Sequence, residues 1–302
     1  MKKQLKIFVI VVTYKGMRWY DKCLGSLRES TIPVQAVVVD NTPGEEDAKY
    51  IREHYPEVHL MKTSENLGFG RANNLGMRYA LDNGCDYVFL LNQDAWILPD
   101  TLKKLISVSE QHPEFGILSP MHMNAEFNKV IMAYYDGHNN VDLINDLYNN
   151  TVQPYYLMRY INAAAWLMTR ATMENVGGFC PMFFQYGEDD DYLNRAYFHK
   201  IPLVLCPHAR VVHDTLVALP EQRQCHERAE REQLYEHLDI NKPFSYNYWR
   251  KKYIKRYVRS IFSLKLATAS KMRKEYMTLK QNRRKIEKCR IAHKLKQPNW
   301  LT

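Results

Sequence analysis

The feature that most constrains this chain is an unbroken apolar run, mostly β-branched, at residues 7–12. A strand with one solvent-facing side alternates apolar and polar residues, whereas an apolar run without alternation is typical of a strand buried on both faces of a parallel sheet. Further apolar runs follow at residues 36–39 and 87–91. We therefore expect an α/β fold with a buried, mostly parallel sheet.

The segments between these runs have helical patterns, and turn-forming residues separate them. The pattern predicts helices at residues 19–30, 45–54, 71–83 and 99–111, and a short strand at residues 58–62. Alternating strands and helices predict βαβ units and a Rossmann-like sheet flanked by helices. Later in the chain, residues 121–160 have little periodicity and predict loops with short strands, and residues 203–206 and 210–212 predict two further short strands.

The 302-residue chain divides by charge. Residues 1–220 carry 20 Lys and Arg against 25 Asp and Glu, whereas residues 221–302 carry 22 against 8. We expect one domain over residues 1–220 and a basic helical extension over residues 221–302. A concentrated positive field suits an anionic partner such as a membrane surface. No recognised nucleic-acid module surrounds the extension, so nucleic-acid binding is not expected.

The cysteines and the N-terminus bear on the compartment. The six cysteines are widely spaced and form no CxxC pair, which favours reduced thiols in the cytoplasm over a zinc site or a disulfide framework. The apolar run at residues 7–12 is too short for a signal-peptide core, and the chain has no stretch of 18 apolar residues. We expect a cytoplasmic protein, soluble or peripheral on the inner face of the membrane.

Polar residues follow three of the predicted strands. They are Thr13 and Tyr14 after the first run, Asp40 and Asn41 after the second, and Asn92, Gln93 and Asp94 after residues 87–91. Turn chemistry alone explains any one of these positions. All three together favour a ligand site, because open α/β sheets bind ligands beyond the carboxyl ends of their strands.

Residues 5–215 contain an ordered set of motifs that resembles the family 2 glycosyltransferases, in particular a rhamnosyltransferase-like branch that acts in cell-surface polysaccharide synthesis. The motifs are Val-Val-Thr-Tyr at 11–14, Asp-Asn-Thr at 40–42, the Asn- and Gly-rich stretch at 65–76, Leu-Leu-Asn-Gln-Asp-Ala at 90–95 and Tyr-Gly-Glu-Asp-Asp-Asp-Tyr at 186–192. The resemblance implies a GT-A fold, an inverting mechanism and a divalent metal.

The resemblance also implies where a nucleotide-sugar donor binds. The implied donor contacts are Thr13, Tyr14, Asp40, Asn41, Asn66, Gly68, Arg71, Asn73, Asn92 and Gln93. The first four would form the nucleoside pocket. The loop at residues 66–74 supplies glycines and a helix N-terminus, which suit close approach to ribose or phosphate. A plain loop-to-helix cap is the simpler interpretation of that loop.

The residues Asn92-Gln93-Asp94 stand where the family has a DxD motif. Mg²⁺ or Mn²⁺ would neutralise a diphosphate, and carboxylate oxygen is its natural ligand. Asp94 is implied as the direct ligand, with Asn92 nearer the sugar or ribose. His213 would complete the metal shell, and imidazole suits Mn²⁺ better than Mg²⁺. A structural role for His213 is the alternative.

Four consecutive acids, Glu188 to Asp191, are the catalytic candidates. An acceptor hydroxyl needs a base to take its proton, and the resemblance places that base at Asp189. Glu188 would orient the acceptor or donor sugar, and Asp191 would support the loop. Because neighbouring carboxylates repel, one pKa should be raised. The simpler interpretation is the first turn of a helix, where acids favour the dipole, and both can hold.

Two aromatic features remain. Trp166 lies either beneath the donor sugar or in the core, and we favour the core. Residues 246–262 form a basic amphipathic helix, continued by a basic stretch at residues 271–296. Its apolar stripe either docks on the catalytic domain or contacts anionic lipid, and the two can coexist.

Together these patterns predict an inverting transferase that moves a sugar from a nucleotide-diphosphate sugar, dTDP-rhamnose or a UDP-sugar, to a hydroxyl of a glycan or lipid-linked acceptor. One alternative is a catalytically inactive protein of the same fold that binds glycan or membrane, which the Asn92 substitution permits. A glycoside hydrolase with paired carboxylates is another, although the nucleoside-pocket motifs argue against it.

Overall fold

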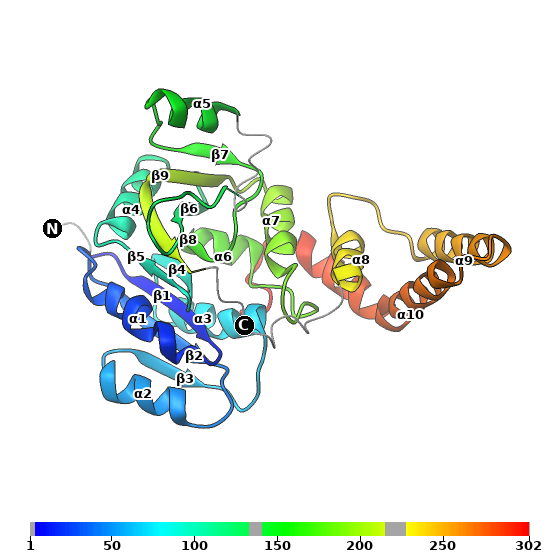
Figure 1. The fold of residues 1–302 in the computed structure, drawn as a ribbon, viewed down its shortest axis with the longest axis horizontal. Coiled ribbons are helices and arrows are strands. Elements are labelled where there is room, and N and C mark those ends of the chain that lie inside the picture. Colours follow the sequence, from blue (N-terminus) through cyan, green and yellow to red (C-terminus); the bar gives the residue numbers. More distant parts are fainter. Residues whose placement is uncertain (1–3, 133–140, 215–227, 302) are drawn as a thin grey trace.

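The computed structural model describes residues 4–132, 141–214 and 228–301. Over these residues it contains one nine-stranded sheet with helices on both faces (Figure 1). The strands are β1 (Ile7–Thr13), β2 (Gln35–Asp40), β3 (His59–Lys62), β4 (Tyr87–Asn92), β5 (Ala95–Ile97), β6 (Ile117–Met123), β7 (Tyr156–Met158), β8 (Ala165–Thr169) and β9 (Leu203–His213). The order across the sheet is β3-β2-β1-β4-β8-β6-β9-β5, with β7 on β9.

The first half of the sheet is parallel, as its apolar runs predict. β1 pairs with β2 and β4, and β2 pairs with β3, all in the parallel sense. The register aligns Thr13 with Asp40 and Val12 with Asn92. The predicted strand-end residues therefore lie side by side at one edge of the sheet.

The second half is mixed. β8 runs antiparallel to both β4 and β6, whereas β6 and β9 are parallel. The two short strands expected near residues 203–212 form the single strand β9. The region 121–160, expected to be loops with short strands, contains the end of β6, the strand β7 and an additional helix, α5 (Val141–Asn149); residues 133–140 lie outside the described residues.

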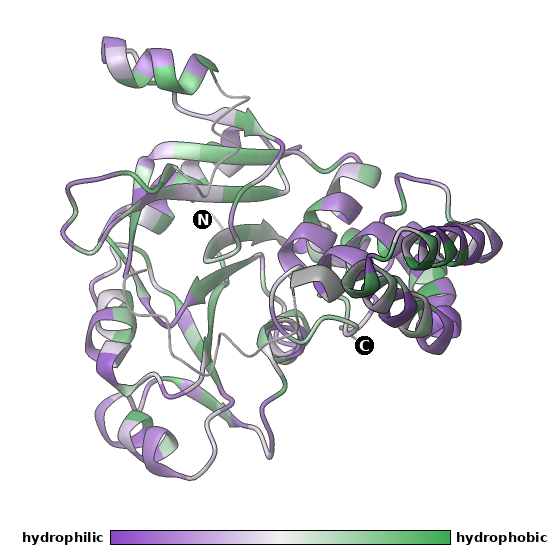
Figure 2. Ribbon diagram, turned by 45° about the vertical axis from the view of Figure 1, so that its right-hand side comes forward, coloured by the Kyte–Doolittle hydropathy of each residue, from purple (hydrophilic) through white to green (hydrophobic). Residues whose placement is uncertain are grey.

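The helices cover the two faces of the sheet in separate sets. They are α1 (Tyr20–Arg28), α2 (Glu46–His54), α3 (Phe69–Asp82), α4 (Thr101–Gln111), α6 (Arg170–Val176) and α7 (Glu188–Phe198). Phe8 and Ile10 of β1 pack in one core with α3, α6 and α7. Val9 and Val11 pack in a second core with α1, α2 and α4. The strands are accordingly apolar on both faces, and Figure 2 shows them mainly green.

Trp166 lies in the first of these cores. Its side chain is fully buried, with its ring stacked on Phe179 and near Tyr192. The core position that we favoured from the sequence matches this packing.

Within residues 228–301, the described part of the C-terminal extension, the chain forms three helices: α8 (Arg228–Leu238), α9 (Tyr246–Phe262) and α10 (Leu266–Lys294). Trp249 and Tyr253 of α9 are buried in a third core with α8, α10 and residues 180–183. Arg290 of α10 donates hydrogen bonds to the carbonyl oxygens of His237 and Asp239 at the end of α8. The α9–α10 hairpin projects away from the sheet (Figure 1).

The last residues return to the sheet. Leu301 is buried in the core beneath α3 and α6, and the backbone of Asn299 accepts a hydrogen bond from the Gly178 N–H. The extension thus contacts the rest of the protein near residues 180–183 and through its last residues. The predicted boundary near residue 220 lies outside the described residues and stays a prediction. In the part of the chain that is described, no helix has the length and apolar character needed to cross a bilayer.

Candidate active site

The site lies at the edge where β1, β2 and β4 end. Thr13 and Asp40 are both buried, and the Thr13 hydroxyl donates to Asp40 Oδ1 at 3.3 Å. The same oxygen accepts from the Thr42 N–H at 2.8 Å, and Lys62 Nζ lies 3.0 Å from Asp40 Oδ2. Asp40 Oδ1 is thus held by hydrogen bonds, whereas Oδ2 has the ion pair with Lys62 but no hydrogen bond of normal geometry among the described residues. Asp40 shapes the pocket, and its contact with a nucleoside stays a prediction.

Asn41 joins the end of β2 to the loop before α3. Its Nδ2 donates to the Gly68 carbonyl at 3.3 Å, and its Oδ1 accepts from Thr63 Oγ1 at 3.2 Å. Asn66 Oδ1 accepts from the Gly68 N–H at 2.9 Å, which forms a tight turn. Gly68 has φ 76°, a conformation that favours glycine. These bonds present the N-terminus of α3 at the edge of the sheet.

Two residues of α3 that we predicted to contact the donor form hydrogen bonds to the backbone four residues earlier, and their contact with the donor stays a prediction. Arg71 Nε donates to the Leu67 carbonyl at 2.8 Å, and the buried Asn73 donates to the Phe69 carbonyl at 3.1 Å. The neighbouring Asn74, which the sequence did not single out, joins the helix to the next segment by two bonds with the backbone of Phe179. The α3 N-terminus is consequently fixed to the segment that precedes α7.

Gln93 ties the loops after β1 and β4 together. Its amide accepts from the Tyr14 N–H at 2.8 Å and donates to the Tyr14 carbonyl at 3.1 Å. Asn92 differs, because its Oδ1 is buried without a hydrogen-bond partner among the described residues. A buried polar atom without a partner is costly and points to a ligand or ion at that place.

Asp94 and His213 meet across the strands β5 and β9. His213 Nε2 lies 3.2 Å from Asp94 Oδ1, and the Asp94 carbonyl accepts from the Asp214 N–H at 2.9 Å. Two neighbouring ligands of an octahedral ion stand about 3 Å apart when each bond is about 2.1 Å. The spacing of this carboxylate and imidazole therefore fits a shared divalent cation, and the orphaned Asn92 oxygen adds a polar group nearby.

The four acids begin helix α7, after a turn with unusual backbone angles. Tyr186 (φ 65°) and Gly187 (φ 90°) are both left-handed. A non-glycine residue in this region stores strain, which is common at functional sites. The turn lies against α3, since the Phe69 N–H donates to the Phe184 carbonyl at 3.2 Å and Gly70 lies close to Glu188. The acids are therefore held beside the α3 N-terminus.

Burial raises the pKa of three of these carboxyl groups, and repulsion by neighbouring carboxylates adds to the rise at Glu188 and Asp190. Glu188 is buried, and desolvation followed by the Asp189 charge raises its pKa to about 8. Desolvation also raises the pKa of Asp189, which is partly exposed. The pKa of Asp190 is raised to about 6 by burial and by Asp189. Glu188 is thus mainly protonated at neutral pH and is able to donate a hydrogen bond.

Asp191 faces the opposite side of α7. Its carboxylate is buried and pairs with the buried Arg195 at 2.9 Å. Arg195 also donates to the carbonyls of Val176 and Gly178. Asp191 therefore holds the segment before α7 in place and does not face the sheet edge of the predicted donor site.

Hydrogen bonds through the segment before β8 connect the Asp94 region to the acids at the start of α7. The Asn92 N–H donates to the Ala164 carbonyl at 2.9 Å, which joins the end of β4 to the segment before β8. In that same segment Tyr160 forms a side-chain hydrogen bond with Asp189 that opposes the rise of its pKa. The Asp94 region and the acids of α7 consequently lie at the same edge of the sheet.

Four residues at this edge had not been singled out from the sequence. Lys62 pairs with Asp40, and Asp47 accepts from the Gly16 N–H and the Tyr20 hydroxyl, which fixes the loop after β1. Tyr160 bonds to Asp189, and the buried His122 lies behind His213 with their ring centroids 5.9 Å apart. No motif marks them, because each acquires its neighbour only through the fold.

Comparisons with known proteins agree with this geometry. The family model described as Glycosyl transferase family 2 matches residues 8–164. The N-acetylglucosaminyl-diphospho-decaprenol L-rhamnosyltransferase of Mycobacterium tuberculosis is 25% identical over 234 residues, which cover 68% of this chain and 75% of that protein.

Solved structures show the same fold. Residues 1–349 of S. aureus TarS, in complex with UDP-GlcNAc, match with a TM-score of 0.60 and 16% identity over 80% of this chain and 68% of that chain. A longer crystallised form of TarS is covered to 41%. The mannosyltransferase PcManGT of Pyrobaculum calidifontis, in complex with GDP-Man and Mn²⁺, matches with a TM-score of 0.52 and 18% identity over 80% and 64%. The chain belongs to glycosyl transferase family 2 and is a glycosyltransferase with a GT-A fold.

Proposed function

We propose that this enzyme transfers a sugar from a nucleoside-diphosphate sugar to a hydroxyl group of a glycan or lipid-linked acceptor, with inversion at the anomeric carbon. The observation that carries the proposal is the shared location of two groups. The partly exposed Asp189, hydrogen-bonded to Tyr160, lies at the same sheet edge as the Asp94–His213 pair. Asp189 suits the role of a base, and the Asp94–His213 pair suits the diphosphate side of the donor.

In the proposed reaction Asp189 takes the proton of the acceptor hydroxyl as the oxygen attacks the anomeric carbon. The new bond to the acceptor oxygen forms while the bond to the diphosphate breaks from the opposite face, so the configuration inverts. The nucleoside diphosphate leaves with the electron pair. Glu188, protonated near neutral pH, orients a sugar hydroxyl by donating a hydrogen bond.

Asp94 and His213 would hold Mn²⁺ or Mg²⁺, which supplies neutralisation of the diphosphate charge when bound. The Asn41-bound loop presents the α3 N–H groups to ribose or phosphate. Thr13 and Tyr14 line the nucleoside side of the pocket. For the sugar we favour rhamnose from a dTDP donor, which rests on the similarity to the mycobacterial rhamnosyltransferase.

The exposed end of the α9–α10 hairpin suits contact with a membrane, which is where a lipid-linked acceptor would be held. Phe262, Leu264 and Leu266 there are 84%, 85% and 67% exposed, and Lys265 and Arg259 lie beside them in sequence. Apolar side chains flanked by cations are typical of a surface that inserts into an anionic membrane interface. We propose that the hairpin places the enzyme on the inner face of the membrane, while the buried Trp249 side of α9 docks on α8 and α10.

A thermal-shift panel tests the donor. dTDP, UDP and GDP, and their sugars, are added with and without Mn²⁺, and dTDP-rhamnose with Mn²⁺ should raise the melting temperature most. If none of the nucleotides shifts the melting temperature, the proposal is wrong. Flotation with anionic vesicles tests the hairpin. Phe262→Ser with Leu264→Ser should reduce binding several-fold relative to Tyr197→Ser, which replaces an exposed residue on α7.

A further inference from the structure

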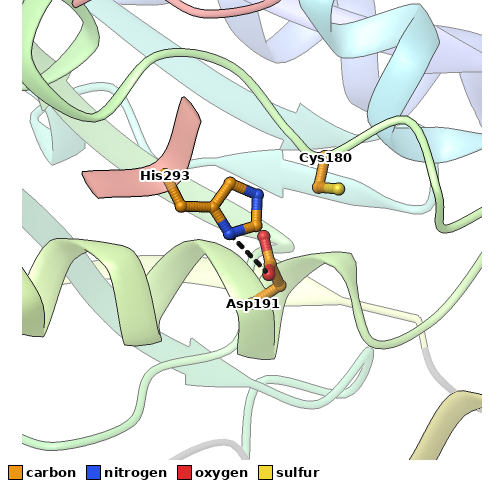
Figure 3. A group of neighbouring side chains, drawn as sticks. All are labelled: Cys180, Asp191 and His293. Atoms are coloured by element: carbon orange, nitrogen blue, oxygen red, sulfur yellow. Dashed lines mark ion pairs between the residues drawn. The ribbon is translucent and has the colours of Figure 1, made fainter. Parts of the chain in front are cut away.

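A second group of side chains that suits a metal lies behind α7, away from the Asp94–His213 pair. Cys180, Asp191 and His293 are all buried, and one ligand atom of each lies within 4.8 Å of the others (Figure 3). They come from the loop before α7, the first turn of α7 and the last turn of α10. The wide spacing of the cysteines in the sequence argued against a zinc site, but the fold brings these distant residues together.

Cys289 supplies a fourth candidate ligand. Its thiol neighbours the Cys180 thiol, and both cysteines are free. Cys289 also stands four residues before His293 on α10, so the two lie on the same face of the helix. Cys180, Asp191 and His293 thus offer three ligand atoms around one point, and Cys289 brings a second thiol next to Cys180. Thiolate, imidazole and carboxylate are all zinc ligands.

His293 gives an independent sign that something is bound there. Its side chain is 1% exposed, and within the described parts of the chain neither ring nitrogen has a hydrogen bond of normal geometry, although the ring lies near the backbone of Leu238. Nδ1 lies 3.8 Å from Asp191 Oδ1 and points toward it in Figure 3.

We propose that Cys180, Asp191, Cys289 and His293 bind one structural zinc ion. Two thiolates and one carboxylate carry three negative charges against two on the ion, and the buried Arg195, 2.9 Å from Asp191, supplies the remaining positive charge. Binding deprotonates the two thiols and releases both protons to solvent. Ligand atoms of a tetrahedral zinc are about 3.5 Å apart, so Cys180, Asp191 and His293 would close inward from their spacing of up to 4.8 Å, and Cys289 would turn its thiol toward them.

This ion would fasten the end of α10 to the first turn of α7. Asp191 lies two residues after Asp189, so the zinc holds the helix that carries the base. The ligands differ from those of the proposed donor site, and the inference does not depend on the reaction proposed above.

Metal analysis of the full-length protein tests the inference. The protein is expressed with zinc in the medium, purified under reducing conditions without chelator, and measured by inductively coupled plasma mass spectrometry. We expect one zinc per chain in the wild type and in Asp94→Ala, which separates this site from the donor site. Cys180→Ser and His293→Ala should lose the zinc. Cys206→Ala, which changes another buried cysteine, should keep it.

Cobalt substitution keeps the test independent of how the variants fold. Wild-type protein stripped by a chelator should melt at a lower temperature, recover on addition of zinc, and with Co²⁺ show the intense visible bands and sulfur charge transfer of a tetrahedral thiolate site. The proposal is overturned if folded wild-type protein contains no zinc and gives no such spectrum with Co²⁺. It is also overturned if both Cys180→Ser and His293→Ala retain zinc, or if the freshly purified chain contains a Cys180–Cys289 disulfide.

Discussion

Replacing Tyr160 with phenylalanine should move the pH dependence of the enzyme. The Tyr160 hydroxyl forms a hydrogen bond with Asp189 that lowers the pKa of this carboxyl, against the larger effect of burial that raises it. Tyr160→Phe removes the bond and keeps the ring. The ionised form of Asp189 then loses stabilisation, so its pKa rises further. Since the reaction requires ionised Asp189, activity should fall at a higher pH than in the wild type.

The size of the shift follows from the strength of the bond. A hydrogen bond to a charged group contributes about 1.5–3 kcal/mol, and one pKa unit corresponds to about 1.4 kcal/mol. The acidic limb should therefore move upward, and at a fixed pH on that limb kcat/KM should fall by up to about tenfold, which corresponds to about 1.4 kcal/mol, because Asp189 is partly exposed and the bond is weaker than a fully buried one.

The assay is kcat/KM for sugar transfer as a function of pH, because this ratio reports the pKa values of the free enzyme. Tyr197→Phe is the matched control, since Tyr197 lies on α7 and is 71% exposed. It should leave the profile unchanged. A Tyr160→Phe profile that coincides with the wild type, or that shifts to lower pH, would refute the role of Asp189 as the base supported by Tyr160.

Three further predictions follow from the site. Because the pKa of Glu188 is raised to about 8, the folded protein loses stability as pH rises from about 4.5 through 8. Calorimetry should therefore show that Glu188→Gln raises the melting temperature at pH 9 and has less effect at pH 5. Gly68→Ala should lower the free energy of unfolding in urea by at least about 1–3 kcal/mol, since φ is positive and the added Cβ would overlap a backbone oxygen. Gly25→Ala, in open space within α1, should instead raise it by about 0.5–1 kcal/mol. Equal changes in the two variants would contradict this reasoning. Asp94→Ala and His213→Ala should each weaken Mn²⁺-dependent binding of the nucleotide by tenfold or more, which corresponds to at least about 1.4 kcal/mol. A calorimetric titration in which these variants keep the wild-type affinity would exclude the metal role.

The parallel half of the sheet was predictable because its strands are buried on both faces. Continuous apolar runs gave β1, β2 and β4, and the carboxyl ends of parallel neighbours necessarily meet, so Thr13, Asp40 and Asn92 could be placed together. The family resemblance added the roles of the motifs. These inferences depend on local pattern and on a general rule of sheet topology.

The remaining features depend on tertiary contacts between distant segments. Tyr160 and Asp189 are 29 positions apart and lack any periodic signal. Residues 121–160 lacked periodicity, so β6 was partly missed and α5, which buries only Leu143, was not expected. The cysteine spacing argued against a metal, whereas the fold brings Cys180 to His293 across more than a hundred residues.

The central claim is that Asp189 takes the acceptor proton while the donor binds at the neighbouring strand ends. Asp189→Asn keeps the shape and removes the base. With the donor identified by the thermal-shift panel, sugar transfer by this variant should have a kcat lower by about 10²–10⁴-fold, while the donor-induced rise in melting temperature stays as in the wild type. A variant that transfers sugar at the wild-type rate would show that this carboxylate is not the base.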